Sequence, residues 1–177
     1  MTYTQHYDSP LGGILLAADD VGLTGLWFDG QKYFARGLSN ERIEQETSVL
    51  AEAKRWLDIY FTGKEPDFTP PLHPIGSAFR RSVWEILLQI PYGQTTTYGE
   101  IARQLSKKQR LDRMSAQAVG GAVGHNEISI IIPCHRVVGA DGSLTGYAGG
   151  IGKKEKLLEL ERADMRRFFV PKKGTAL

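Results

Sequence analysis

Residues 130–139 read Ile-Ile-Ile-Pro-Cys-His-Arg-Val-Val-Gly, and they hold the only cysteine of the 177-residue chain. The apolar run predicts a buried strand, and Pro133 predicts that this strand ends just before the cysteine. Cys134 and His135 therefore bring a soft nucleophile and a potential base to the point where a strand gives way to a loop. Catalytic residues often lie at such points.

The reactivity of this cysteine depends on its neighbours. A thiol reacts as the thiolate, and a free cysteine with a pKa of about 8.5 needs a histidine, a cation or a helix N-terminus nearby to ionise near neutral pH. His135 and Arg136 follow Cys134 directly and are candidates for that role. The alternative is that Cys134 is a small buried hydrophobe with no chemistry. The residues of this run alone leave both interpretations open.

Composition predicts a soluble globular protein of one or two domains. The longest apolar stretch is far too short to cross a bilayer, and the first residues lack the features of a signal peptide, so we expect a cytoplasmic protein with no membrane partner. A single cysteine excludes an internal disulfide and a cysteine-based zinc cluster. The histidines are too scattered to indicate a metal site, and we expect neither a metal nor a cofactor.

Charge is distributed unevenly along the chain. Residues 1–70 carry 6 Lys/Arg against 11 Asp/Glu, and residues 71–177 carry 16 against 9, so the net charges are −5 and +7. A basic second half is expected if it meets a polyanion, although a solvated basic face without a partner would have the same composition.

The first 70 residues predict a scaffold domain. Three strand-like segments, residues 3–7, 14–18 and 23–28, are separated by turn sequences and predict a small antiparallel sheet. Apolar residues then recur at helical spacing over residues 49–61, with Ser48 in position to cap the helix. No residue pattern in this region indicates chemistry.

A proline-rich stretch over residues 66–74 predicts a domain boundary, followed by a mainly helical domain over residues 75–165 and a basic tail over residues 166–177. Helices are expected at residues 78–90 with Ser77 as the cap, at 98–105 with a Thr97–Glu100 capping box, at 115–124, and at 153–162. The expected fold class is therefore α/β, of the α+β kind.

The second and third of these helices predict a helix-turn-helix. Lys107, Lys108, Arg110 and Arg113, set against Asp112, give their connection a net charge of +3 over residues 106–114. This charge suits phosphate contact, although a solvated loop is an equal alternative. The third helix contains three glycines within residues 116–124. Such a helix is costly unless a nucleic-acid groove or a tightly packed helix approaches its backbone.

The residues around the cysteine also carry a family resemblance. Asn126 lies eight residues before Cys134, Pro-Cys-His-Arg-Val surrounds it, and Gly-Tyr-Ala-Gly-Gly follows at residues 146–150. Together they resemble the active-site signature of the O6-alkylguanine-DNA alkyltransferases, the methylated-DNA–protein-cysteine methyltransferases, which move an alkyl group from DNA onto their own cysteine. The resemblance is close over residues 79–161. In residues 1–70 it extends only to the order of strands followed by a helix.

The resemblance implies catalytic roles for five residues. Cys134 would accept the alkyl group from a base held outside the duplex. His135 would deprotonate Cys134 through a water, and Glu161 would fix the imidazole tautomer. Tyr98 would give a proton to the leaving guanine, and Asn126 would tie the recognition helix to the active site.

The resemblance also implies a substrate pocket and a DNA surface. The pocket would be lined by Val137, Tyr147, Ala148, Gly149 and Gly150. The DNA contacts would come from Ser115, Ala116, Gln117, Arg136, Lys107, Lys108, Arg110 and Arg113. Gln117 departs from the family, which usually has an arginine there that fills the space left by the extruded base. Glutamine carries no charge and lacks the multi-donor plane of guanidinium, so efficient base extrusion is in question.

The predicted function is a monomeric DNA repair protein that acts once, on double-stranded DNA containing O6-alkylguanine. Whether O4-alkylthymine is also accepted stays open. A non-catalytic helix-turn-helix regulator is the alternative, but it gives no purpose to the Cys-His-Arg run or to Glu161. A cysteine hydrolase would use the same Cys and His, and turnover of an acyl substrate would distinguish it.

Overall fold

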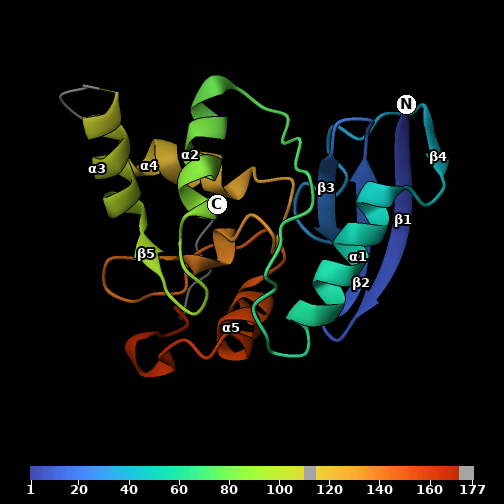
Figure 1. Ribbon diagram of the computed structural model, residues 1–177. Helices are drawn as coiled ribbons and strands as arrows, with labels where there is room; N and C mark the ends of the chain where they lie inside the picture. The colour runs from blue at the N-terminus through green and yellow to red at the C-terminus, as the bar shows by residue number, and fades with distance from the viewer. Residues whose placement is uncertain (110–114, 172–177) are drawn as a thin grey trace. The chain divides into compact units, whose positions relative to one another are not determined.

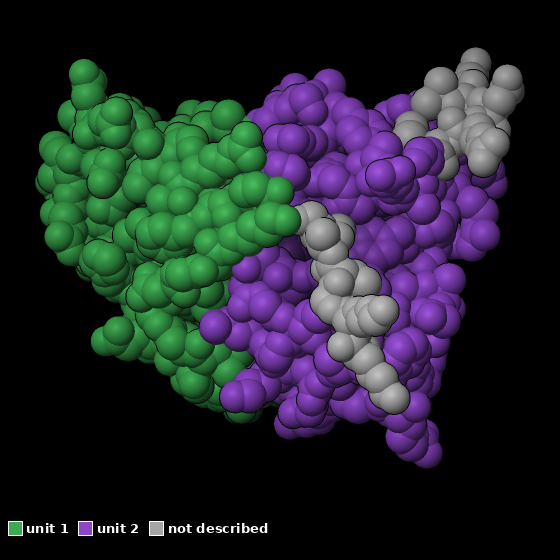
Figure 2. Space-filling view, turned by 180° about the vertical axis from the view of Figure 1, so that it is seen from behind, with its two compact units in different colours: residues 1–75, 127–131 green, residues 76–126, 132–177 purple. Residues whose placement is uncertain are grey.

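The computed structural model describes residues 1–109 and 115–171 (Figure 1). The chain divides into two compact units (Figure 2). Unit 1 contains residues 1–75 and 127–131, and unit 2 contains residues 76–126 and 132–177. A short segment just before the cysteine thus belongs to unit 1, although it is far from the rest of that unit in sequence. The predicted division into domains at residues 1–70 and 75–165 stays a prediction.

Unit 1 is built on a four-stranded sheet in the order β3-β2-β1-β4. The predicted strands are confirmed as β1 (Thr2–Ser9), β2 (Gly12–Ala18) and β3 (Leu23–Phe28), which pair antiparallel. The sequence analysis missed β4 (Arg42–Glu44), which pairs parallel to β1. All three residues of β4 are exposed, so this edge strand has no apolar alternation to reveal it.

Helix α1 (Ser48–Tyr60) packs on this sheet through its buried apolar side chains. The Tyr7 hydroxyl of β1 donates to Asp58 of α1 at 2.6 Å. The residue that caps the helix is Thr47, whose hydroxyl accepts from the Leu50 N–H, and the predicted cap Ser48 is the first helical residue. Leu15 and Trp27 form a separate buried cluster that packs with Ala35 and Leu38 from the turn-rich segment after β3.

The segment 127–131 pairs with β3 inside unit 1. The Leu26 N–H donates to the Glu127 carbonyl, the Ser129 N–H donates to the Leu26 carbonyl, and the Trp27 indole donates to the Glu127 side chain at 2.5 Å. The strand predicted for the isoleucine run is wrong. Ile130 has φ 70°, and the Ile131 N–H donates back to the Ser129 carbonyl, so the run is a buried turn. Burial explains its apolar character, and the left-handed residue interrupts any strand.

Unit 2 contains a group of packed helices, α2 (Ala78–Leu88), α3 (Tyr98–Lys108) and α4 (Ala116–Gly124). The predicted N-caps Ser77 and Thr97 are confirmed, because their side chains accept from backbone N–H groups of the first turn. Ser115, predicted as the first residue of its helix, is the N-cap of α4 and accepts from the N–H groups of Gln117 and Ala118. The indole N–H of Trp84 in α2 donates to the Ala122 carbonyl of α4 at 2.9 Å. The helices α3 and α4 are the pair predicted as a helix-turn-helix.

The second half of unit 2 consists of short elements and one helix. The 3-10 helix η1 (Cys134–Arg136) leads into β6 (Val137–Val138), which pairs parallel with β5 (Thr96–Thr97) just before α3. Helix α5 (Ile151–Leu160) and the 3-10 helix η2 (Met165–Arg167) follow. The Phe169 N–H then donates to the Gly142 carbonyl and the Leu144 N–H donates to the Phe169 carbonyl. Residues 165–169 are therefore attached to the loop after β6.

The predicted fold class is confirmed, since the chain combines a small sheet and its helix in one unit with a mainly helical second unit. The β5–β6 pair has the greatest consequence for the site. It joins the residue before Tyr98 to the residues after Arg136, which are about forty positions apart in sequence. Within residues 1–109 and 115–171, no helix is long and apolar enough to span a membrane.

Candidate active site

Cys134 begins η1 and is buried, with 6% of its surface exposed. Its N–H donates to the Ile132 carbonyl at 2.8 Å, and the same carbonyl accepts from the Asn126 side-chain amide at 2.9 Å. Asn126 also hydrogen-bonds the Cys134 thiol. This asparagine follows α4 and is itself buried, so one amide connects the end of α4 to the turn that presents the cysteine.

Glu161, directly after α5, binds the next two residues of η1. Its Oε2 lies 2.6 Å from His135 Nε2, and its Oε1 accepts from Arg136 Nε at 2.8 Å. Arg136 Nη2 donates to Oε2 at 3.1 Å, and the Gly93 N–H donates to Oε1 at 3.1 Å. The side chains of His135 and Glu161 are completely buried. The carboxylate is thus surrounded by donors that fix its orientation.

These contacts determine the protonation of the pair. Burial alone would raise the pKa of Glu161, but the hydrogen bonds from His135 and Arg136 and the charge of Arg136 outweigh it and hold the pKa well below its usual range. Burial lowers the pKa of His135, and this effect exceeds the opposing influence of Glu161. An ionised Glu161 beside a neutral His135 requires the proton on Nε2. His135 Nδ1 has no hydrogen-bond partner in the described part of the chain, so its lone pair is available to a proton.

Cys134 and Tyr98 both have raised pKa values. Burial raises the pKa of the Cys134 thiol, opposed by the Asn126 hydrogen bond and by the charge of Lys154. Burial also raises the pKa of Tyr98 to about 12, and the nearby Cys134 adds to this. The Tyr98 hydroxyl donates to the Thr145 carbonyl at 3.2 Å. Tyr98 is therefore a protonated donor at neutral pH, and Cys134 needs assistance to ionise.

The predicted pocket residues lie in two segments of unit 2. Val137 is buried in β6, and Tyr147 is buried with its ring 6.4 Å from the His135 ring in an edge-on arrangement. Ala148 and Gly149 are partly exposed, and Gly150 is exposed at φ 100° just before α5. Tyr147 thus lies edge-on to the histidine ring, and the three residues after it are at least partly exposed.

The predicted DNA-contact residues fall into three groups. Ser115, Ala116 and Gln117 are all exposed at the N-terminus of α4. Lys107 and Lys108 are exposed in the last turn of α3, which extends beyond its predicted end. Arg110 and Arg113 lie outside the described residues.

Arg136 has a different environment from the one predicted. It is only 8% exposed, it is paired with Glu161, and its Nη1 donates to the Ile90 carbonyl at 2.7 Å. The resemblance implies a DNA contact for Arg136, whereas in the described structure its guanidinium is bound to Glu161 and to the Ile90 carbonyl. The contact with Glu161, 25 residues away in the sequence, directs the side chain inward.

The glycines of α4 differ in their surroundings. Among the described residues, a Cβ added at Gly121 would meet nothing within 4 Å, so none of them requires a glycine there. Gly121 is exposed, whereas Gly120 and Gly124 are buried. Of the two explanations raised by the sequence, a tightly packed helix does not apply to Gly121.

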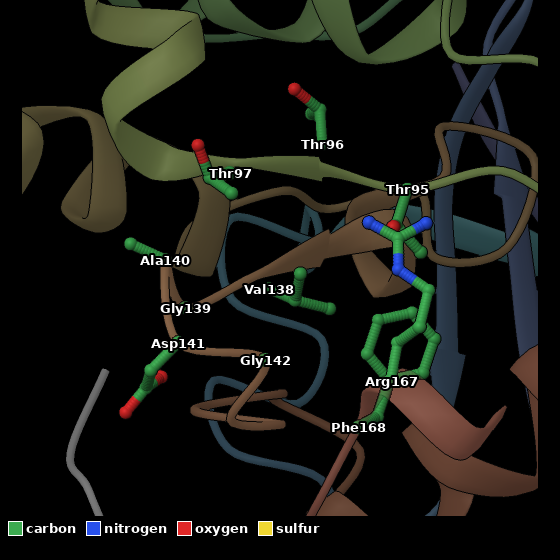
Figure 3. A pocket seen from close by; sticks show the side chains of 10 residues that line it. All are labelled: Thr95, Thr96, Thr97, Val138, Gly139, Ala140, Asp141, Gly142, Arg167 and Phe168. Carbon is green, nitrogen blue, oxygen red and sulfur yellow. The ribbon is translucent and has the colours of Figure 1, made fainter. Parts of the chain in front are cut away.

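A separate surface pocket of about 230 Å³ lies elsewhere in unit 2 (Figure 3). Its walls come from the segment leading into α3, the segment from β6 to Gly142, and the end of η2 with Phe168. None of the predicted catalytic residues lines it. In the described parts of the chain, no group of three or more His, Cys, Asp or Glu side chains could hold a metal ion.

Comparison with known proteins identifies the family. The family model described as "6-O-methylguanine DNA methyltransferase, ribonuclease-like domain" matches residues 2–74, and the one described as "6-O-methylguanine DNA methyltransferase, DNA binding domain" matches residues 78–163. The chain belongs to the 6-O-methylguanine DNA methyltransferase family. The resemblance inferred from the residues around Cys134 is therefore confirmed.

Members of this family resemble the chain over nearly its whole length. The methylated-DNA–protein-cysteine methyltransferase of Methanosarcina acetivorans is 44% identical over 160 residues, covering 90% of this chain and 97% of that protein. The Mycobacterium leprae protein of the same name is 43% identical over 162 residues, covering 92% and 93%. The crystal structure of Mycobacterium tuberculosis OGT in complex with DNA has a TM-score of 0.78 and 40% identity, covering 94% of each chain.

The sequence analysis missed two residues, Lys154 and Gly93, that the fold of this protein brings to the candidate site. Lys154 of α5 is fully buried and lies near Cys134 and Tyr98 through its contacts with the segment around Thr145. Gly93 donates to Glu161, and its φ of 76° suits glycine. The sequence did contain a signal for the burial of Lys154. It lies three residues before Leu157 and four before Leu158, which places all three side chains on the same face of α5.

Proposed function

We propose that this protein repairs DNA by transferring the alkyl group of an O6-alkylguanine to the sulfur of Cys134, once per molecule. The observation that carries the proposal is the buried contact of 2.6 Å between His135 Nε2 and Glu161 Oε2, placed beside the only cysteine of the chain. Membership of the 6-O-methylguanine DNA methyltransferase family and likeness to a relative crystallised with DNA support it.

The proposed reaction begins with ionisation of Cys134. Its proton passes to His135 Nδ1, through a water as in the family, and the imidazolium is stabilised by the ionised Glu161 on the other nitrogen. The thiolate then attacks the alkyl carbon. A sulfur–carbon bond forms as the carbon–O6 bond breaks, and the electron pair of the broken bond stays on the guanine.

Tyr98 completes the reaction by giving its hydroxyl proton to the guanine, on which negative charge develops. Its raised pKa of about 12 keeps that proton in place until it is needed. The product is a thioether at Cys134, which has no good leaving group. The protein therefore stops after one transfer.

DNA binding is proposed for the exposed N-terminus of α4 and the end of α3. Ser115, Ala116 and Gln117 contact the duplex, with phosphate contacts from Lys107 and Lys108 and from Arg110 and Arg113. The target base is extruded at a cost of a few kcal/mol, because a base inside the stack cannot offer its alkyl carbon to the sulfur. The pocket that receives it is formed by Val137, Tyr147, Ala148, Gly149 and Gly150.

The buried residues near the cysteine receive positioning roles. Asn126 orients the thiol from the end of α4. We propose that Arg136 holds the Glu161 carboxylate and makes no DNA contact. We also propose that the protein acts as a monomer, because one copy of the chain provides every residue of the proposed active site, and that it acts in the cytoplasm.

The test is incubation of the protein with duplex DNA containing one O6-methylguanine, followed by intact-mass and peptide analysis. We expect the mass to rise by one methylene on the peptide containing Cys134, with one equivalent of methyl accepted per protein. The Cys134→Ala variant should bind the duplex and accept nothing. Repeated turnover, or methyl on another residue, would refute the proposal. Hydrolysis of an acyl ester with turnover would support a cysteine hydrolase in its place.

A further inference from the structure

Lys154 is completely buried, in the second turn of α5. Fully buried lysines are rare, because removal of the ammonium from water is costly. The contacts of the ammonium must therefore offset this cost, and they show which groups it serves.

All hydrogen-bond partners of the Lys154 ammonium in the described structure are backbone carbonyls. It donates to Val137 at 2.5 Å, to Thr145 at 2.8 Å and to Gly146 at 3.2 Å. The first carbonyl belongs to β6, which follows the Cys134 turn, and the other two precede Tyr147. One side chain thus ties the strand after the cysteine to the segment that carries a proposed pocket residue.

The buried charges of unit 2 are out of balance when the thiol is neutral. In the described residues, the buried charged groups are Arg136, Lys154 and Glu161. Burial lowers the pKa of Lys154 to about 8, so most of this lysine is still protonated at neutral pH. Glu161 is paired with Arg136, so Lys154 has no carboxylate of its own. Cys134 interacts electrostatically with Lys154. Ionisation of Cys134 would supply a negative charge to balance the Lys154 ammonium. Lys154 is therefore positioned to favour the thiolate over the neutral thiol.

The Thr145 carbonyl also links Lys154 to Tyr98. This oxygen accepts both the Tyr98 hydroxyl at 3.2 Å and the Lys154 ammonium at 2.8 Å. If Tyr98 redirects its proton to a guanine, the carbonyl still has Lys154 as a donor. The buried carbonyl is therefore not left without a donor, which would be unfavourable.

We propose that Lys154 is a positioning residue for alkyl transfer: its buried ammonium balances the Cys134 thiolate and holds the Thr145 carbonyl, so that Tyr98 can release its proton. The inference rests on the proposed function, because it assigns Lys154 to that reaction. The other titratable or charged groups around the cysteine are Tyr98 from α3, His135 and Arg136 from η1, and Glu161 after α5.

The charge effect is tested without DNA by the pH dependence of Cys134 alkylation by iodoacetamide. Lys154→Met removes the charge and keeps an unbranched side chain, and Lys156→Met changes an exposed lysine of the same helix. We expect the midpoint of the Lys154→Met profile to rise by about one to two pH units, as loss of a nearby cation predicts. The Lys156→Met profile should match that of the unaltered protein. A folded Lys154→Met protein with an unchanged midpoint would overturn the charge effect.

Two further variants guard against loss of structure. Lys154→Gln keeps a donor without the charge and replaces Lys154→Met if the latter does not fold, with the same expected shift. Lys154→Arg keeps the charge, so its midpoint should stay near that of the unaltered protein. A shift in Lys154→Arg equal to that in the neutral variant would attribute the effect to packing and overturn the assignment.

The link to Tyr98 is tested by a double-mutant cycle on transfer from duplex DNA. If Lys154 acts through Tyr98, the rate loss in Lys154→Met combined with Tyr98→Phe should be smaller than the product of the two single losses. Independent, multiplying losses would overturn that link. No transfer by the unaltered protein, together with a shifted iodoacetamide profile, would refute the proposed function and leave the charge effect on Cys134 supported.

Discussion

At the scale of single residues, the site depends on a neutral histidine held by an ionised carboxylate. Glu161 accepts from His135, Arg136 and the Gly93 backbone, so its position is determined from several directions. Removal of this carboxylate would leave Arg136 as an unpaired buried charge, a loss that typically costs about 3–5 kcal/mol. Glu161 therefore contributes to the stability of unit 2 as well as to the proposed chemistry. His135 is the better residue for testing the reaction alone.

We predict that His135→Ala slows transfer from duplex DNA by about 10²–10⁴-fold near neutral pH, the usual contribution of a general base. The loss should shrink as the pH rises, because burial raises the pKa of Cys134 and the thiol then ionises without assistance only at higher pH. The measurement is the single-turnover rate as a function of pH. If the variant and the unaltered protein had profiles of the same shape, His135 would not be the base.

At the scale of elements, α4 combines an exposed N-terminus with a glycine that no packing contact requires. We predict that Gly121→Ala stabilises the protein by about 0.8–1.0 kcal/mol, as helix propensity implies. Transfer from duplex DNA should nevertheless fall, because the added methyl would meet the DNA. Gly152→Ala is the matched control in α5, since that glycine is also exposed with open space around it. If Gly121→Ala transferred the alkyl group from duplex DNA as fast as the unaltered protein, DNA would not approach closely at Gly121.

The same element carries Gln117, exposed in the first turn of α4. We predict that Gln117→Arg makes transfer from duplex DNA faster, because guanidinium can fill the space of an extruded base with more donors and a charge. Its reaction with free O6-benzylguanine should be unchanged, since no base has to be extruded. Equal acceleration with both substrates would show that residue 117 acts on the pocket and not on extrusion.

At the scale of the whole molecule, charge is separated between the two units. Unit 1 carries 6 Lys/Arg against 12 Asp/Glu, net −6, and unit 2 carries 16 against 8, net +8. We predict that duplex affinity falls steeply with salt, and that Lys107→Ala with Lys108→Ala flattens the log–log slope by up to about 0.9 per lost phosphate contact. Lys64→Ala, an exposed lysine of unit 1, should leave the slope unchanged. An equal change in both variants would mean that net charge, and not these contacts, sets the affinity.

Local chemistry was predictable from the sequence because it depends on residues close together in the chain. The caps Ser77 and Thr97 could be predicted because a capping side chain bonds an N–H group three residues away. The sheet of unit 1 was predictable from its strands and turns. The family could be identified from the residues around Cys134, since their spacing is a property of the sequence itself.

Only the tertiary structure decided which distant groups meet. The isoleucine run seemed to be a strand because burial and strand formation produce the same apolar pattern, and the φ of Ile130 is invisible in sequence. Arg136 seemed free to bind DNA until its pairing with Glu161 was known. Lys154 had no apparent role, because its partners are backbone carbonyls, which every residue has. The sequence by itself determined the family and pointed to Cys134 as the proposed nucleophile. The electrostatic balance around Cys134 comes from side chains that only folding brings together.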